Sequence, residues 1–181
     1  MDCVRAPQQQ SREKGARPLL SQREVVEALA RELARCAICD RPFSALLIGY
    51  GQRRGLDGEP TDDQVEALGN LILQHTRSVD LAGRYGKTEL LVLLPETSGV
   101  GALALAERLR AEVIQPSRSV APIDGRHQSG VSIALVEYGM NTRSLHSFLN
   151  AADRALRLAT EQRSTNVQVA EGCQPELALR A

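Results

Sequence analysis

The order of apolar and polar positions along the chain predicts helices and strands in alternation. Apolar residues at helical spacing predict helices, and short apolar or alternating runs predict strands. The predicted helices span 22–36, 61–79, 97–113 and 144–160. The predicted strands span 43–50, the two arms of a hairpin over 81–95, then 130–136 and 166–169.

Local signals support these elements. Ser21 and Glu24 form an S-x-x-E capping box ahead of the first helix, and Thr61 caps the second. The unbroken apolar run 90–94 indicates a strand buried on both faces, with the hairpin turn at Gly86. Alternating elements predict an α/β sandwich in which helices cover a sheet. The direct hairpin makes that five-stranded sheet mixed, with 43–50 as its central strand.

Composition narrows the kind of protein. Hydrophobic residues make up 43% of the 181 positions, but aromatic residues only 3% with no Trp, so we expect an aliphatic core. Lys plus Arg and Asp plus Glu number 22 each, which gives no global attraction to a nucleic-acid polymer or an anionic membrane. No signal peptide and no apolar run of membrane-spanning length is visible, so we expect a cytoplasmic protein.

The folded part of the chain is expected to be one domain. The segment 1–18 is rich in Gln, Arg, Ser and Gly without periodicity, and we expect it to be disordered. The domain is placed at 19–170 and a C-terminal tail at 171–181.

Four cysteines are present, and two of them form the C-x-x-C of Cys36 and Cys39. No second pair or nearby His completes a tetrahedral zinc set, so no metal site is expected here. We interpret the pair as small, semi-buried thiols at a helix end.

The hairpin sequence Arg84-Tyr85-Gly86-Lys87-Thr88-Glu89-Leu90 resembles the RYGGDEF hairpin of bacterial diguanylate cyclases, the GGDEF family. The strand text GVSIALVEY and the helix text FLNAADRALRLA resemble further family motifs, and the likeness covers about 23–169. The resemblance implies the ferredoxin-like, palm-type fold of nucleotidyl cyclases.

By the same resemblance, the catalytic residues are lost. The family binds its divalent metal with the first acid of a D-x-D after the central strand and with the third signature residue. These positions are Gly49 and Thr88 here, and the second D-x-D acid is Gly51. A hard cation needs carboxylate oxygens, and Glu89 alone does not replace two ligands. The second signature glycine, which approaches the phosphates, is Lys87. We therefore expect no catalytic residues, no metal and no cofactor, and a degenerate domain that is not an enzyme.

Other family positions agree with this expectation. The phosphate-binding Lys and Arg of the family fall at Thr160 and Ser164. Asp57 and Asp63 align only loosely with the guanine-reading groups.

One functional set of the family is retained. Active cyclases carry an inhibitory product site with the motif R-x-x-D five residues before GGDEF, and Arg77 and Asp80 have that spacing. Arg108 matches a further arginine of the site. A guanidinium can engage the O6/N7 edge of guanine or a phosphate, and a carboxylate can accept from guanine N1–H and the 2-amino group. The resemblance thus implies a cyclic di-GMP receptor that signals to a protein partner or a second copy.

Several alternatives stay open at this point. The spacing of Arg77 and Asp80 also fits an ordinary ion pair near a helix end. The domain would then be a ligand-free scaffold for a partner or a dimer. GTP sensing without turnover and residual cyclase activity are two further hypotheses, and the missing carboxylates count against both.

Overall fold

The computed structural model describes residues 17–50, 60–114, 131–161 and 167–171, and these form one sheet with helices on both faces. The helices are α1 (Gln22–Cys39), α2 (Asp62–His75), α3 (Gly99–Ile114) and α4 (Leu145–Glu161). The strands are β1 (Phe43–Tyr50), β2 (Leu81–Arg84), β3 (Glu89–Pro95), β4 (Val131–Glu137) and β5 (Gln168–Val169). The predicted order of elements is confirmed.

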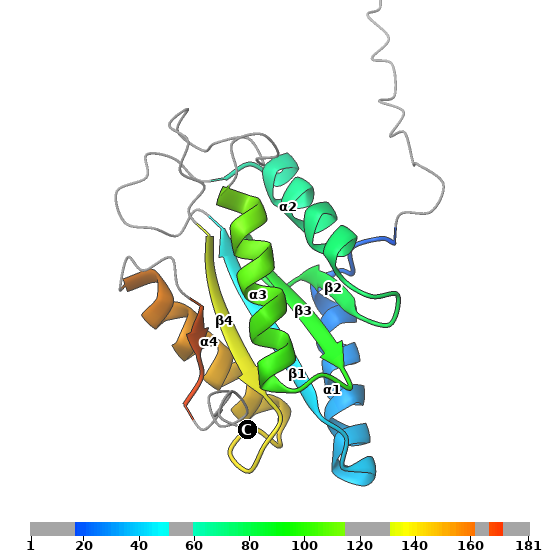
Figure 1. The fold of residues 1–181 in the computed structure, drawn as a ribbon. Coiled ribbons are helices and arrows are strands. Elements are labelled where there is room, and N and C mark those ends of the chain that lie inside the picture. Colours follow the sequence, from blue (N-terminus) through cyan, green and yellow to red (C-terminus); the bar gives the residue numbers. More distant parts are fainter. Residues whose placement is uncertain (1–16, 51–59, 115–130, 162–166, 172–181) are drawn as a thin grey trace, which may run out of the picture.

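The sheet has the order β2-β3-β1-β4-β5, so β1 is central as predicted (Figure 1). β1 pairs antiparallel with both β3 and β4, and β2 pairs antiparallel with β3. β5 pairs parallel with β4, which makes the sheet mixed. The predicted α/β class and its five-stranded mixed sheet are therefore confirmed.

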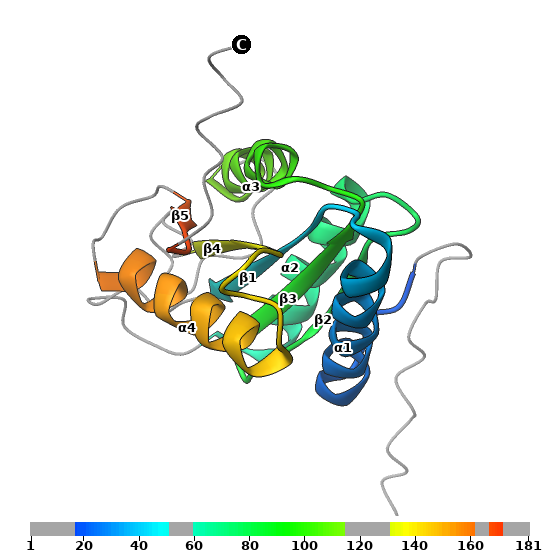
Figure 2. The same ribbon diagram turned by 90° about the horizontal axis from the view of Figure 1, so that it is seen from below.

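Two apolar clusters fill the space between the sheet and its helices. One packs α1 and α4 against one face, and the other packs α2 and α3 against the opposite face. Figure 2 shows α3 and α4 on opposite sides of the sheet. β1 is buried along its whole length, and alternate residues enter the two clusters, as Leu46 and Leu47 do. Within the part of the chain that the structure describes, no helix has the length and apolar character to cross a membrane.

Helix α1 begins at its predicted capping box but ends later than predicted. Ser21 Oγ accepts from the Glu24 N–H while the Glu24 carboxylate accepts from the Ser21 N–H. The helix continues to Cys39, where Asp40 adopts a left-handed φ of 47° and donates its N–H to the Cys36 carbonyl. Cys36 is therefore buried and Cys39 exposed, within the last turn of the helix.

Helix α2 ends earlier than predicted. It was expected to continue to about Val79, and it stops at His75 because Thr76 is extended, with φ −104° and ψ 157°. Arg77 and Asp80 consequently lie in a turn between α2 and β2. Their backbones are joined by the Asp80 N–H donating to the Arg77 carbonyl at 3.1 Å.

The chain before α1 lies along the sheet edge. The Leu20 N–H donates to the Ala82 carbonyl at 3.0 Å, and the Arg84 N–H donates to the Leu20 carbonyl at 2.9 Å. Leu20 thereby forms a parallel bridge with Gly83 of β2. This bridge anchors residues 17–20 beside β2 and the turn that precedes it.

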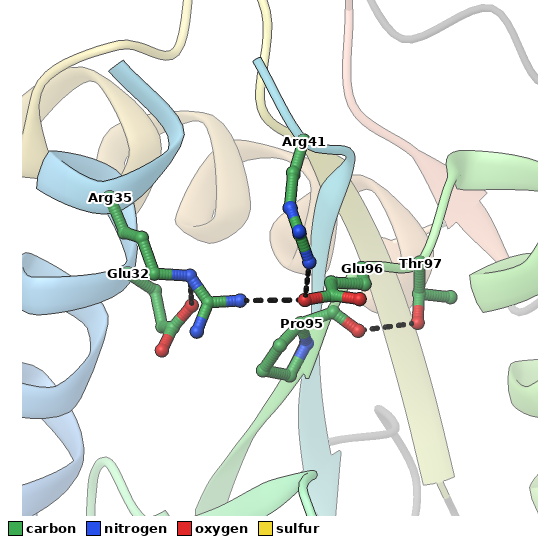
Figure 3. Close-up of polar contacts among 6 residues, drawn as sticks. All are labelled: Glu32, Arg35, Arg41, Pro95, Glu96 and Thr97. Carbon is green, nitrogen blue, oxygen red and sulfur yellow. Dashed lines mark hydrogen bonds and ion pairs between the residues drawn. The ribbon is translucent and has the colours of Figure 1, made fainter. Parts of the chain in front are cut away.

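An ionic cluster joins α1 to the end of β3 (Figure 3). The Glu96 carboxylate pairs with Arg35 at 3.2 Å and also with Arg41, and Arg35 lies 3.6 Å from Glu32. Glu96 has a left-handed φ of 53°. Thr97 Oγ1 donates to the Pro95 carbonyl at 3.0 Å and so fixes the turn into α3. These partly exposed groups stabilise the connection between β3 and α3.

Candidate functional site

A cavity of about 300 Å³ lies between the C-terminal end of α2, the end of β3 and the N-terminal half of α3. It contains all three of the residues that the sequence placed in a ligand site. The lining residues are His75, Arg77, Asp80, Leu94, Thr97, Gly101, Ala104, Leu105 and Arg108.

Asp80 is the most buried charged group of this site. Its side chain is only 3% exposed. Oδ2 accepts a 2.6 Å hydrogen bond from the Arg77 N–H, whereas Oδ1 has no hydrogen-bond partner among the described residues. A buried carboxylate oxygen without a donor is unfavourable. A ligand that donates hydrogen bonds would remove this penalty.

The two arginines approach the cavity from different elements. Arg77 is exposed on the turn, and among the described residues its guanidinium forms no ion pair or hydrogen bond. Arg108 extends from α3 and donates to the His75 carbonyl at the end of α2 at 2.6 Å. The side chains of Arg77 and Asp80 do not form the ion pair of the alternative interpretation, since Asp80 binds the backbone of Arg77 instead.

The remaining lining gives the cavity an amphipathic character. Leu94, Ala104 and Leu105 present apolar surface, and His75 adds a polar residue to the lining. Two cations outnumber the single carboxylate, so the cavity favours an anionic ligand. The arrangement suits a flat, partly apolar ring that carries both hydrogen-bond donors and acceptors and is linked to phosphate.

The sequence did not predict a further arginine beside the cavity. Arg17 lies in the segment expected to be disordered, most of which is outside the described residues. Its guanidinium donates to carbonyls at the end of α2 and in the following turn. No motif marks Arg17, and its partners are about 60 residues away in the chain. The sequence therefore carries no local signal of this contact.

The second candidate region is the hairpin. Gly49 pairs with Glu89 across β1 and β3, and the Tyr50 N–H donates to the Thr88 carbonyl at 2.9 Å. The two positions at which the resemblance places metal acids are thus adjacent in space. Within the described ranges, no three His, Cys, Asp or Glu side chains are grouped so as to hold a metal ion.

Other predicted positions of the hairpin site are dispersed. Thr160 Oγ1 donates to the Leu156 carbonyl within α4 at 2.9 Å, and Asp63 is exposed in the first turn of α2. Gly51, Asp57 and Ser164 lie outside the described residues.

Three titratable groups meet between the hairpin and α4. Burial raises the pKa of Asp153, the Glu89 carboxylate raises it further, and a hydrogen bond from Tyr85 opposes the shift. Burial also raises the pKa of the Tyr85 phenol, and the charges of Asp153 and Glu89 add to this effect. This contact joins the hairpin to α4.

Comparisons with known proteins agree with this fold. The family described as "Diguanylate cyclase, GGDEF domain" matches residues 20–166. Diguanylate cyclase A of Treponema denticola is 34% identical over 108 residues, which are 59% of this chain and 27% of the relative. Response regulator PleD of Caulobacter vibrioides is 31% identical over 105 residues, which are 56% of this chain and 23% of the relative. The chain therefore spans about a quarter of the length of these relatives.

Solved structures share the fold at lower identity. The GGDEF domain of YfiN from Pseudomonas aeruginosa has a TM-score of 0.71 and 22% identity, with 84% of this chain and 97% of that chain covered. The GGDEF domain of DgcB from Caulobacter crescentus, solved in complex with c-di-GMP, has a TM-score of 0.69 and 20% identity, with 95% and 98% covered. With the family match over 20–166, the palm-like sheet and the retained hairpin, this chain belongs to the GGDEF domain family.

Proposed function

We propose that this GGDEF domain is a receptor that binds cyclic di-GMP in the cavity between α2 and α3 and does not synthesise it. The observation that carries the proposal is the position of Asp80. Its carboxylate is buried, one of its oxygens lacks a donor among the described residues, and it lines the same cavity as Arg77 and Arg108. A fold neighbour, the DgcB GGDEF domain, has been solved with c-di-GMP bound.

The groups of the cavity match the chemistry of this ligand. Asp80 Oδ1 would accept from guanine N1–H or the 2-amino group, which adenine does not offer in the same arrangement. The fork of Arg77 suits the O6 and N7 atoms of guanine, and Arg108 suits a phosphodiester. The apolar wall of Leu94 and Leu105 would cover the face of a base.

The absence of synthesis is the second part of the proposal. It is supported by Gly49 on β1 and Thr88 directly before β3, which stand where the family has metal-binding acids. Without carboxylates there, a divalent ion has little to hold it or to activate a ribose hydroxyl. Incubation with GTP and Mg²⁺ or Mn²⁺ should yield no cyclic di-GMP. Formation of cyclic di-GMP by the native protein, but not by the denatured protein, would overturn this part.

Calorimetric titration with cyclic di-GMP tests the receptor. The protein should bind with micromolar or tighter affinity, and cyclic di-AMP should bind more weakly. Arg77→Ala and Asp80→Asn should each weaken binding at least about tenfold, since each removes a charge-assisted hydrogen bond. Arg157→Ala, on the exposed face of α4, is the matched control and should bind normally. No heat at high ligand concentration would overturn the proposal.

A second candidate function is a ligand-free scaffold for a protein partner. Two apolar side chains, Ile38 at 85% and Met140 at 86% exposure, favour it. The GGDEF protein SiaD from Pseudomonas aeruginosa, a fold neighbour, has been solved in complex with its activator SiaC. Normal function in cells that carry Arg77→Ala would support the scaffold over the receptor.

A further inference from the structure

Arg17 binds the backbone of the two residues that define the candidate ligand site. Nη1 donates to the carbonyls of Arg77 and Asp80, the latter at 2.9 Å. Nη2 donates to the carbonyls of Leu73 at 2.8 Å and Thr76 at 3.0 Å, and to Thr76 Oγ1 at 3.0 Å. One guanidinium therefore joins the last turn of α2 to both ends of the turn that carries the site.

These bonds supplement those within the turn itself. Inside the turn, the Arg77 N–H donates to Asp80 Oδ2 and the Asp80 N–H donates to the Arg77 carbonyl. Arg17 binds the carbonyl groups of the same two residues. Because both N–H and C=O groups of the turn are held, the directions of the Arg77 and Asp80 side chains toward the cavity are restricted.

The chemistry of this contact requires an arginine. The end of a helix presents unpaired carbonyls and a partial negative charge, so a cation there is favourable. Only a guanidinium offers two NH₂ groups in a fixed plane that reach four carbonyls at once, whereas an ammonium is a point charge. Arg17 is also held in place, because Leu20 is bridged to β2 three residues later.

A second guanidinium binds the same end of α2. Arg108, itself a residue of the candidate site, donates to the carbonyl of His75, which lies in the sequence between Leu73 and Thr76, whose carbonyls Arg17 binds. The position of the helix end thus depends on Arg17 from one side and on Arg108 from the cavity side. A shift of α2 after loss of Arg17 would therefore also displace a ligand-binding group.

We infer that Arg17 is a positioning residue of the ligand site, which it orders through backbone carbonyls without touching the ligand. The inference rests on the proposed function for its ligand. By thermodynamic reciprocity, a ligand that selects the ordered turn also strengthens the hold of Arg17 on that turn.

Titration of the whole chain with cyclic di-GMP tests this role. Arg17→Ala should weaken binding about tenfold, since it removes hydrogen bonds from a charged donor to the turn. Arg17→Lys keeps the positive charge but not the forked guanidinium. Its affinity for cyclic di-GMP should lie between those of Arg17→Ala and the unchanged protein. Arg23→Ala is the matched control, because Arg23 is exposed and, within the part of the chain that the structure describes, pairs only with Glu27; this variant should bind as the unchanged protein does. Equal affinity of Arg17→Ala and the unchanged protein would overturn the inference.

Hydrogen exchange without ligand supplies the second readout. The amides of Arg77 and Asp80 should exchange faster in Arg17→Ala, whereas those of the central strand β1 should not change. A merely structural role would lower global stability and speed exchange everywhere, which would contradict positioning. If the unchanged protein binds no cyclic di-GMP, the proposed function fails. Unchanged exchange at Arg77 and Asp80 would then overturn the ordering role of Arg17 as well.

Discussion

The carboxylate of Asp80 accepts a 2.6 Å hydrogen bond from the backbone N–H of Arg77, three residues earlier. This bond explains why the two residues of the R-x-x-D motif lie in a turn and not on a helix. It occupies one carboxylate oxygen and leaves the other without a partner among the described residues. The same side chain therefore shapes the site and offers it an acceptor.

Two substitutions of Asp80 should separate these roles. Asp80→Ala removes the acceptor for the Arg77 N–H and should lower the free energy of unfolding by about 1.5–3 kcal/mol, the range for hydrogen bonds to charged groups. Asp80→Asn keeps one acceptor oxygen, so its free energy of unfolding should fall by less than half of that amount. Urea unfolding measures both, and equal losses would show that the hydrogen bond does not define the turn.

Gly83 should tolerate no side chain. A Cβ on this residue of β2 would lie 2.7 Å from the Val25 Cβ and 2.8 Å from the Leu20 carbonyl oxygen. The backbone atom has nowhere to move without breaking the bridge between Leu20 and Gly83. Gly83→Ala should therefore destabilise the protein by about 1–3 kcal/mol.

Gly139→Ala is the matched control for this prediction. No atom lies within 4 Å of a Cβ at Gly139, and its unfolding free energy should change by at most about 0.5 kcal/mol. Thermal unfolding of the two variants should therefore differ clearly. Equal midpoints would show that the edge bridge is not tightly packed.

Much of the fold was predictable because its elements follow simple periodicities. Three local signals each specify one element, and all three are confirmed: the run 90–94, the capping box at Ser21 and the cap at Thr61. The end of α2 was not predictable in this way. No Gly or Pro stops the helix, and the side chains that bind its last turn and the following turn, Arg17 and Asp80, lie outside it.

The candidate site was predictable in part. The resemblance named Arg77, Asp80 and Arg108, and the fold brings them to one cavity. It did not reveal His75, which also lines the cavity. It also did not reveal that Asp80 binds a backbone N–H, since R-x-x-D spacing on a helix predicts a side-chain pair. Such details depend on where α2 ends, which is a tertiary property.

Glu96 allows a test of backbone strain apart from ion pairing. Its left-handed φ of 53° is unfavourable for a residue with a Cβ, while its carboxylate pairs with Arg35 and Arg41 (Figure 3). Glu96→Ala and Glu96→Gly lose the same ion pairs, but only Gly removes the strain. Glu96→Gly should thus be about 1 kcal/mol more stable than Glu96→Ala in urea unfolding. The difference should not change with salt concentration, because the pairs are absent from both variants.

The contact between the hairpin and α4 should give the protein a pH dependence of known sign. Burial and the charge of Glu89 raise the pKa of Asp153 in the folded state. The folded protein therefore holds this proton more tightly than the unfolded chain does. The stability that protonated Asp153 contributes is complete below its unfolded pKa of about 3.9. This stability is lost as the pH rises through the pKa that Asp153 has in the folded protein.

Asp153→Asn should remove this dependence, because the amide stays neutral and still accepts a hydrogen bond from Tyr85. Relative to the unchanged protein, the variant should gain stability as the pH rises from about 4 to about 7. Tyr85→Phe should act in the opposite direction, since it removes the hydrogen bond that favours the carboxylate. Urea unfolding at several pH values measures these differences, and carbon NMR of the Asp153 carboxyl reports its titration directly. Parallel pH profiles for Asp153→Asn and the unchanged protein would show that the charge of Asp153 is fully solvated in the folded state.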